Sequence, residues 1–434
     1  MGRYRKERVS GMMKKFLSGF LAPLFLVVSV NMSFAATTQV DSLVELLVDK
    51  GIITRSEGIK LKGEIAADEK IVREEGFKQS LPQWVQDTKL KGDVRVRYQN
   101  ERRDSTNSRH RGRIRMRLGL ETKANDKVKV AVGLATGGNS TNGGDPRSTN
   151  QTLENSFEKP DLRLDYAYLQ YAPTEWASLL GGKFLAPFWS PKDLVFDTDI
   201  SFDGTAANFK KKHSDKLSSF FNTGFFILDE NTADTTDPYM WFVQPGLTIK
   251  TTQNTSLKLA SGLWWVDNVK GKPALAFTSS SNTLLGSLHR YDYRMFISNA
   301  EYAINNPFGL KQIPQLAFFG EFVNNPYADE QDNGFLAGVK IGDTKIAGPG
   351  QWQLSYNWRR LERNAVLDIF PDSDFYGGAT HVQGQEVELQ YGLGKNVFLG
   401  LDYYRSAPIG GEDIDTRQAR VENLVQVDLN AKFP

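Results

Sequence analysis

The chain has 434 residues and is polar on average, at a mean hydropathy of −0.42, yet it is rich in aromatic residues and glycine, with 27 Phe, 15 Tyr, 8 Trp and 38 Gly. This composition excludes a bundle of membrane-spanning helices, because each such helix needs about 20 consecutive apolar residues, whereas a spanning strand needs about 10 with every second one apolar. The absence of cysteine excludes disulfides and thiolate metal sites. The formal net charge of +2 points to no polyanionic partner.

Residues 1–35 predict a secretory signal peptide. A basic start precedes an apolar run from Phe16 to Val30, and the small residues Ser33 and Ala35 stand at positions −3 and −1 of a cleavage site. A membrane anchor is the alternative, but the apolar run is shorter than a span and ends in this site. Removing six of the 53 basic and one of the 51 acidic residues leaves a net charge of −3, which argues against nucleic acid as a partner.

Residues 36–82 predict a short helical segment. Apolar residues recur at helical spacing from Val40 to Val48, Gly51 ends that pattern, and Thr54 to Glu57 opens a second helix as S/T-x-x-E. The second helix is apolar on one face and charged on the other, which fits a small coiled coil and a solvated linker equally well. The Leu81-Pro82 pair ends the helical segment.

From residue 88 to residue 434 the hydrophobic period changes to two, which is the period of a β-strand. In the first strand, for example, Leu90, Val94, Val96 and Tyr98 alternate with charged residues. We expect about 16 strands, an even number, near residues 90–98, 113–120, 128–134, 161–171, 176–186, 203–212, 217–228, 240–251, 256–267, 291–304, 314–324, 333–343, 350–361, 383–394, 395–405 and 420–433.

The connections between these strands alternate between short and long along the chain. The short ones lie near residues 125–126, 173–174, 214–215, 253–254, 305–309, 347–350 and 394–396. The long ones lie near residues 101–110, 136–160, 187–202, 229–239, 267–290, 325–332, 362–382 and 406–419. Short turns on one rim and long loops on the other are typical of a transmembrane antiparallel β-barrel and not of a soluble sandwich, so the fold class is all-β.

Three parts of the sequence carry a family resemblance. The last strand alternates from Val425 to Phe433, and a terminal aromatic residue resembles the signal by which outer-membrane proteins reach the barrel-assembly machinery, although Pro434 follows here. The segments 46–54, 81–85 and 89–98 resemble the bacterial putative-porin family. The resemblance implies location in the outer membrane, with residues 36–82 as a helical or coiled-coil segment in the periplasm.

The register of the first two strands predicts an arginine ladder on the inner wall of the barrel. A barrel of this size encloses a water-filled channel. The ladder is composed of Arg95, Arg97, Arg113, Arg115 and Arg117. A fixed positive field of this kind favours anions, and the alternative is that these residues are ordinary solvated lumen charges with no bearing on selectivity.

The third long connection supplies acidic residues that could face the ladder. Asp193, Asp197 and Asp199 lie there among aromatic residues such as Phe188 and Trp189, which would be awkward on an outer surface. In general porins, which the chain resembles in strand count, the third extracellular loop folds into the barrel and narrows it. The resemblance implies a transverse field between these Asp residues and the ladder.

The sequence therefore predicts a passive diffusion channel for small hydrophilic solutes and ions, anion-preferring, in contact with outer-membrane lipid and assembled as a homotrimer. A substrate-specific channel for phosphate or small carboxylates, and a structural barrel, are the alternatives. An enzyme is not expected, because the four histidines fall in loops or turns without a triad spacing, a metal spacing or a phosphate-binding loop. We expect no catalytic residues, no cofactor and no metal.

Overall fold

The computed structural model describes residues 43–64, 82–104, 107–137, 143–232, 235–411 and 420–433, in two compact units, Met1–Pro82 and Gln83–Pro434. The predicted signal peptide, residues 36–42 and 65–81 of the predicted helical segment, and Pro434 lie outside the described residues.

The described part of the first unit contains two short helices, at residues 43–49 and 55–64. The second helix begins with the expected reciprocal cap, since the Thr54 backbone N–H donates to Glu57 Oε2 at 2.7 Å and the Glu57 N–H donates to Thr54 Oγ1 at 3.3 Å. Gly51, between the helices, has a φ of 69°, which glycine adopts without a steric penalty. Among the described residues, no helix has both the length and the apolar character needed to cross a membrane.

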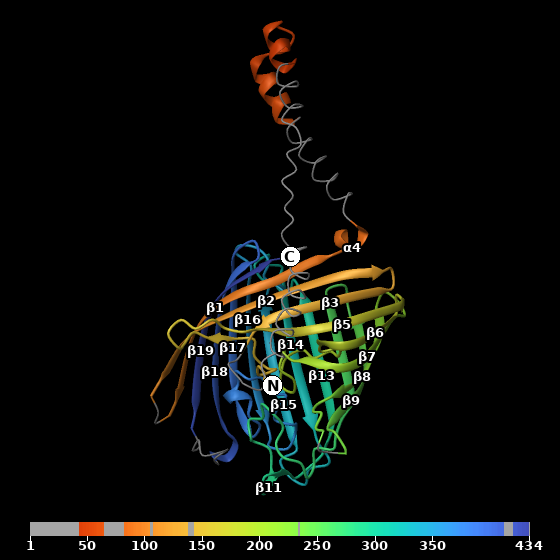
Figure 1. Ribbon diagram of the computed structural model, residues 1–434, viewed down its shortest axis with the longest axis vertical. Helices are drawn as coiled ribbons and strands as arrows, with labels where there is room; N and C mark the ends of the chain where they lie inside the picture. The colour runs from red at the N-terminus through yellow and green to blue at the C-terminus, as the bar shows by residue number, and fades with distance from the viewer. Residues whose placement is uncertain are drawn as a thin grey trace, which may run out of the picture. The chain divides into compact units, whose positions relative to one another are not determined.

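The second unit is a closed 16-strand antiparallel β-barrel (Figure 1), as predicted. A four-residue helix, α4 (Gln83–Gln86), precedes it. The long strands are β1 (Lys89–Arg103), β2 (Arg109–Asn125), β3 (Val128–Thr136), β5 (Leu162–Thr174), β6 (Ala177–Leu185), β7 (Ser201–Lys212), β8 (Leu217–Ile227), β9 (Tyr239–Lys250), β10 (Thr255–Asp267), β13 (Tyr293–Asn305), β14 (Gln315–Asn324), β15 (Asn333–Gly342), β16 (Trp352–Leu361), β17 (Val382–Gly394), β18 (Val397–Pro408) and β19 (Glu422–Phe433).

Each long strand pairs with its neighbour in the chain, and the barrel closes where β1 pairs with β19 over Gly92↔Phe433 to Arg103↔Glu422. Closure leaves the described wall without an open strand edge, which a membrane requires. Short elements lie in the long connections: β4 (Gln151–Thr152) adds to β2, β11 (Leu284–Leu285) pairs with β12 (Leu288–His289), and two short 3₁₀ helices, η1 and η2, follow. The 3₁₀ helices are η1 (Tyr376–Gly378) and η2 (Ile409–Gly411).

Alternation along the strands turns the apolar face outward. In β1, Val96 and Tyr98 are 53% and 49% exposed, whereas Arg97 between them is 3% exposed. This is the reverse of a soluble protein and is expected where lipid covers the outer surface. The two rims differ as predicted: α4 and the short turns lie at one end, and the long connections, such as the one holding β11, lie at the other (Figure 1).

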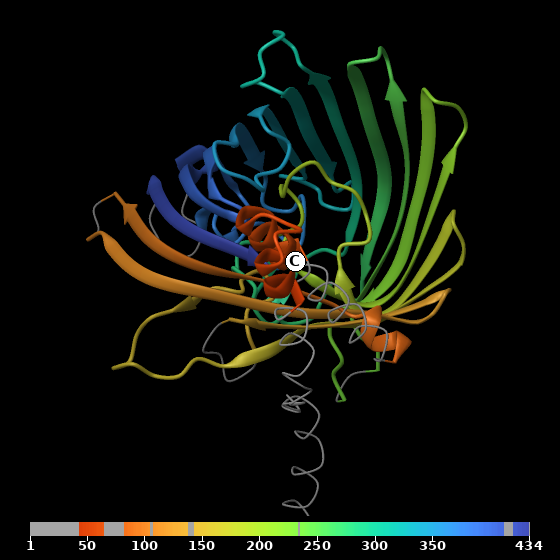
Figure 2. The ribbon, with the colours of Figure 1, turned by 90° about the horizontal axis from the view of Figure 1, so that it is seen from above.

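Two long connections fill part of the lumen. Loop 187–200 lies inside the ring of strands, in yellow-green in Figure 2, and loop 362–381 is mostly buried. Their apolar residues, such as Leu194, Phe196 and Leu367, form one cluster with inward-facing side chains of the wall, such as Trp264 and Met295. The interior is therefore a packed apolar half beside an ionic half, and the wider channel that strand number alone predicts is narrowed from one side.

Candidate functional site

The five arginines of the ladder lie side by side on β1 and β2. The register places Arg95 opposite Arg115 and Arg97 opposite Arg113, with Arg117 opposite Asp93. Like charges directly opposite one another on adjacent strands are destabilising, so this arrangement requires carboxylates close by.

Those carboxylates come mainly from the wall itself. Asp93 accepts from Arg115 Nε at 2.9 Å and from Arg117 Nε at 2.8 Å. Asp428 on β19 accepts from both Nε and Nη2 of Arg97, at 2.7 and 2.8 Å. Three of the five guanidinium groups are thus held in charge-assisted hydrogen bonds, and their field is partly cancelled locally.

The other two arginines of the ladder have weaker carboxylate contacts. Arg95 lies 3.6 Å from Asp428 and donates to Asn150 Oδ1 at 2.5 Å. Arg113 donates to Gln99 Oε1 at 3.1 Å and has no carboxylate within 4.0 Å among the described residues. Within the ladder, these two side chains supply the least compensated positive charge.

The three predicted aspartates of loop 187–200 take different places. Asp199 reaches the ladder, with its Oδ1 3.4 Å from Arg117 Nη1. Asp193 lies on the other side and pairs with Arg359 of β16 at 2.8 Å. Asp197 accepts the backbone N–H groups of Asp199 and Ser373, each at 2.9 Å, so it links loop 187–200 to loop 362–381.

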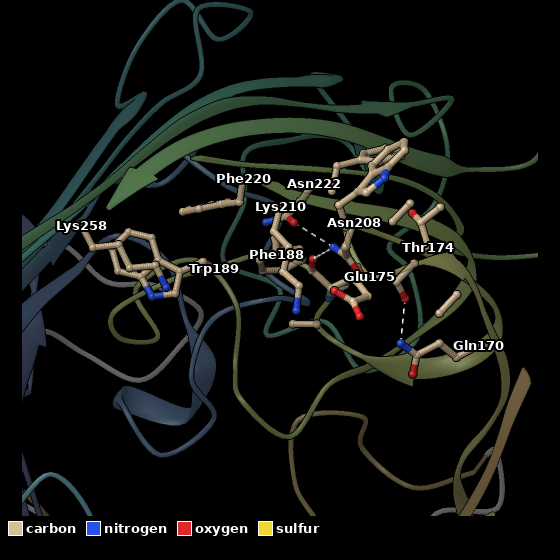
Figure 3. Close-up of a pocket in the computed structure, with 17 residues that line it drawn as sticks. Gln170, Thr174, Glu175, Phe188, Trp189, Asn208, Lys210, Phe220, Asn222 and Lys258 are labelled. Atoms are coloured by element: carbon tan, nitrogen blue, oxygen red, sulfur yellow. Dashed lines mark hydrogen bonds between the residues drawn. The ribbon is translucent and has the colours of Figure 1, made fainter. Parts of the chain in front are cut away.

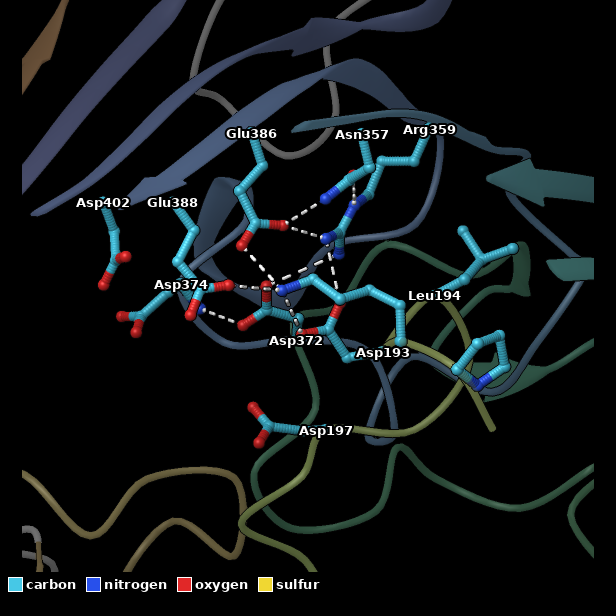
Figure 4. A network of polar contacts seen from close by, with 12 residues as sticks. Asp193, Leu194, Asp197, Asn357, Arg359, Asp372, Asp374, Glu386, Glu388 and Asp402 are labelled. Atoms are coloured by element: carbon cyan, nitrogen blue, oxygen red, sulfur yellow. Dashed lines mark hydrogen bonds and ion pairs between the residues drawn. The ribbon is translucent and has the colours of Figure 1, made fainter. Parts of the chain in front are cut away.

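A second charged network, drawn in Figure 4, joins β16 and β17 to the two long loops. Lys192 contacts Glu386 at 2.9 Å and Glu388 at 3.4 Å, both on β17. Arg359 contacts Glu386 at 2.5 Å and Asp372 at 3.4 Å, in addition to Asp193. Two cations therefore hold four carboxylates together, those of Asp193, Asp372, Glu386 and Glu388.

Three arginines of the ladder and most residues of this second network line one cavity of about 180 Å³, here called the ionic cavity. Its cationic lining residues are Arg95, Arg97, Arg115, Arg147 and Lys192. Its acidic lining residues are Asp193, Asp197, Asp199, Asp372, Asp374, Glu386, Glu388 and Asp402. Acidic residues outnumber basic ones, so the lining of the ionic cavity is not positive overall despite the ladder.

Burial and neighbouring charges shift the pKa of several loop residues at the ionic cavity. Burial, reinforced by Asp199, raises the pKa of Asp197 well above its usual value. Burial, reinforced by Asp193, likewise raises the pKa of Asp372. Burial opposes ionisation of Asp374 too, but Arg97, Arg113 and Arg95 outweigh it and lower its pKa. The cavity therefore holds carboxylates that differ in their response to acid.

Three carboxylates at the cavity bring oxygen atoms within 4.8 Å of one another: Asp193, Asp372 and Glu386. Oxygen ligands of this kind suit hard cations such as Ca²⁺. Here Arg359 contacts all three groups and Lys192 contacts two of them, so side-chain cations already compensate the charge. The cluster is better described as a salt-bridge network than as a metal centre.

Polar residues of the apolar wall anchor loop 187–200 by its backbone. Gln244 on β9, which is 0% exposed, accepts from the Trp189 N–H at 2.9 Å and donates to the Trp189 C=O at 2.7 Å. Glu321 on β14 accepts the N–H groups of Lys192 and Leu194 at 2.6 and 3.1 Å. Because these partners are buried, the loop has a fixed conformation in the lumen.

Sequence reasoning missed several residues of the site. Arg359, Glu386 and Asp428 continue the polar faces of their strands, so the period-two pattern could have identified them as lumen residues. Lys192 and Asp372 lie in long loops, and no local pattern indicates where such side chains point.

The sequence matches one family model, and the fold is similar to that of solved outer-membrane proteins. A family model described as putative porin matches residues 60–110, 102–296 and 287–433. No curated protein matches the sequence. Among solved structures, OprB of Pseudomonas putida matches with a TM-score of 0.53 at 11% identity, over 80% of this chain and 94% of that chain. OmpF of Salmonella typhi, solved with daunomycin, gives 0.48 at 12% over 80% and 97%, and OmpT of Vibrio cholerae, in a trimer form, gives 0.44 at 11% over 80% and 99%.

The closed barrel, its apolar outer face and the family match together support an outer-membrane channel. The chain belongs to the putative porin family, whose model covers most of its length. The likeness to OprB, at 11% identity, shows the fold alone.

Proposed function

We propose that the chain is a passive diffusion channel for small hydrophilic solutes and ions. The observation that carries the proposal is the ionic cavity, where the arginine ladder faces the carboxylates of loops 187–200 and 362–381. Opposed charges with no enclosing apolar pocket orient a dipolar solute without binding it tightly, which favours transit over retention.

The ion preference follows from the balance of these charges. The ladder alone favours anions, but Asp93 and Asp428 hold three of its members and acidic residues are in excess at the ionic cavity. We therefore expect a weaker anion preference than the ladder would give by itself, supplied mainly by Arg95 and Arg113.

A substrate-specific channel for phosphate or small carboxylates is the second candidate. Arg95 and Arg113 favour it, because guanidinium groups without a close carboxylate partner bind oxyanions in a two-pronged geometry. The Asp374 carboxylate, which influences both groups, weakens that tendency.

The remaining parts of the proposal concern export and assembly. Cleavage after Ala35 would leave residues 36–82 as a periplasmic segment and 88–434 as the barrel, delivered by the barrel-assembly machinery through the last strand. A homotrimer is part of the proposal. Mass spectrometry of the exported chain and crosslinking in native membranes check cleavage and trimer formation.

Liposome swelling tests the proposed function. Vesicles containing the folded barrel are placed in isotonic solutions of neutral sugars of increasing size, and of phosphate. A passive channel gives swelling rates that fall smoothly with solute size and rise linearly with concentration. Phosphate entry that saturates at low concentration, with little sugar entry, would contradict the passive channel and support the substrate-specific one. A correctly folded barrel that gives no swelling would contradict both and support a structural barrel.

A further inference from the structure

A second cavity lies on the lumen side of the wall, toward the rim of short turns. Its volume is about 550 Å³, and we call it the lysine cavity (Figure 3). The residues on which its chemistry depends are Phe188, Trp189, Asn208, Lys210, Phe220 and Lys258. Loop 187–200 separates it from the ionic cavity, since Trp189 lines the one and Lys192 the other.

The two lysines of this cavity form no close ion pair with any described residue. Neither Lys210 nor Lys258 has a carboxylate within 4.0 Å among the described residues, in contrast to Lys91, which pairs with Glu121 at 2.9 Å. Two acidic groups lie near these two basic ones: Glu175 also lines the cavity, and Glu301 of β13 stands opposite Lys258 in the sheet but forms its ion pair with Lys340, at 3.8 Å. Because neither lysine is held in a close ion pair by the part of the chain that the structure describes, both ammonium groups are available to the carboxylate of a ligand that enters the cavity.

Aromatic rings surround the Lys258 ammonium group. Its Nζ lies 4.2 Å from the centre of the Trp189 ring and 5.4 Å from that of Phe220, and Trp189 and Phe220 themselves meet edge to face. These contacts stabilise the cation through ring faces but leave its N–H donors without an anionic acceptor. A ligand with a carboxylate beside a flat ring would satisfy both features at once.

The cavity is preformed. A row of amides on adjacent strands holds the loop beside it: Asn208 donates to the Pro187 C=O at 2.5 Å and to Asn222 at 2.9 Å, and Asn222 donates to Gln244 at 3.0 Å. Gln244 in turn fixes Trp189 on both sides of its backbone. Because Trp189 is already held in place, little conformational entropy is lost when a ligand stacks on its ring.

We propose that the lysine cavity is a subsite for small aromatic carboxylates, with the carboxylate at Lys258 and Lys210 and the ring against Trp189 and Phe220. The inference rests on the proposed channel function, because solutes reach the cavity through the lumen. It goes beyond that function by assigning one class of solute a binding site, between loop 187–200 and the rim of short turns.

Benzoate is the probe, and binding to the folded barrel in detergent micelles is measured by calorimetry or ligand-observed NMR. Saturable binding of benzoate is expected. Acetate, neutral benzamide and benzylammonium should each bind about tenfold more weakly, because acetate lacks the ring and the other two lack the negative charge. Lys258→Met and Trp189→Leu should each weaken benzoate binding about tenfold.

The matched control is Lys129→Met. Lys129 also faces the lumen and lies over a ring, that of Tyr168 at 5.7 Å, but it is 3.8 Å from the carboxylate of Glu121. It should leave benzoate binding unchanged. Heat-modifiable electrophoretic mobility confirms that every variant is a folded barrel, and if Lys258→Met does not fold, Lys210→Met takes its place.

Equal binding of benzoate and acetate, or benzoate binding that survives both cavity variants, would overturn the subsite. Because binding is measured without current, its failure is separate from failure of the channel. A conducting barrel that does not bind benzoate refutes the subsite alone, and a barrel that binds benzoate but passes no solute refutes the channel alone.

Discussion

The two walls of the lumen are built differently from strands of the same alternating pattern. The wall formed by β1, β2 and β17–β19 faces inward with charges, and its key ion pair, Arg97 with Asp428, joins positions 331 residues apart. The wall formed by β6–β10 and β13–β15 faces inward with rings and aliphatic side chains. Loop 187–200 belongs to both, since Phe196 packs on the apolar wall and Asp199 meets the ladder.

This difference teaches how a barrel positions a charged loop. An ionic wall alone would leave the loop solvated and mobile, whereas an apolar wall gives it a dry surface on which burial of rings fixes its place. The acidic side chains are then presented at set distances to the opposite wall. We therefore expect substitutions on the apolar wall to alter selectivity, although they remove no charge.

The largest expected effect comes from breaking the buried charge network of the ionic half. Arg359→Met leaves Asp193, Asp372 and Glu386 without their shared cation, which should lower the free energy of unfolding by about 3–5 kcal/mol. Urea unfolding of the barrel in lipid vesicles measures it. Arg360→Met, next in the chain but with a side chain 31% exposed, is the control, and equal unfolding midpoints for both variants would refute the network as a stabilising element.

On the apolar wall, Gln244→Leu should have a smaller effect on stability and a visible one on the pore. It leaves the N–H and C=O of Trp189 without this partner, which costs about 1–3 kcal/mol and loosens loop 187–200. Unfolding measurements and single-channel noise report the two consequences. Gln170→Leu, whose side chain bonds only Ser178 among the contacts described, is the control and should keep a quiet channel.

Within the ladder, the least paired arginine should matter most for selectivity. Arg113→Gln removes charge that no carboxylate holds within 4.0 Å among the described residues, so the reversal potential should move toward cations. Arg97→Gln should move it less, because Asp428 and Asp374 already compensate the charge of Arg97. Identical shifts for the two variants would contradict the role of local pairing.

The smallest expected effect is a pH dependence of selectivity. The raised pKa values of Asp197 and Asp372 mean that acid neutralises them at a pH above the ordinary aspartate value of 3.8, so acidification should shift the reversal potential toward anions in that range. The same raised pKa values affect stability. Protonated Asp197 and Asp372 contribute most to the free energy of unfolding at low pH, and this contribution is lost as the pH rises through their folded-state pKa values. Asp197→Asn should reduce the shift, and a shift that begins only below pH 3.8 would exclude these groups.

Much of the barrel could be predicted from sequence because its signal is local. The period-two pattern places Val96 outside and Arg97 inside, and turn residues mark the strand ends, so strand number and the contrast between rims follow directly. The partners of the ladder did not follow, because closure of β1 on β19 brings Asp428 to Arg97 only in three dimensions. The apolar half of the lumen was also not predicted, since strands such as β8, with rings on both faces, give no contrast between inside and outside.

Single-channel conductance of the refolded barrel in a planar bilayer, with a salt gradient across it, tests the central claim most directly. The account predicts stable ohmic steps with a weak anion preference that Arg113→Gln diminishes. A barrel shown to be folded by its heat-modifiable mobility that gives no steps would contradict the channel and leave only the fold.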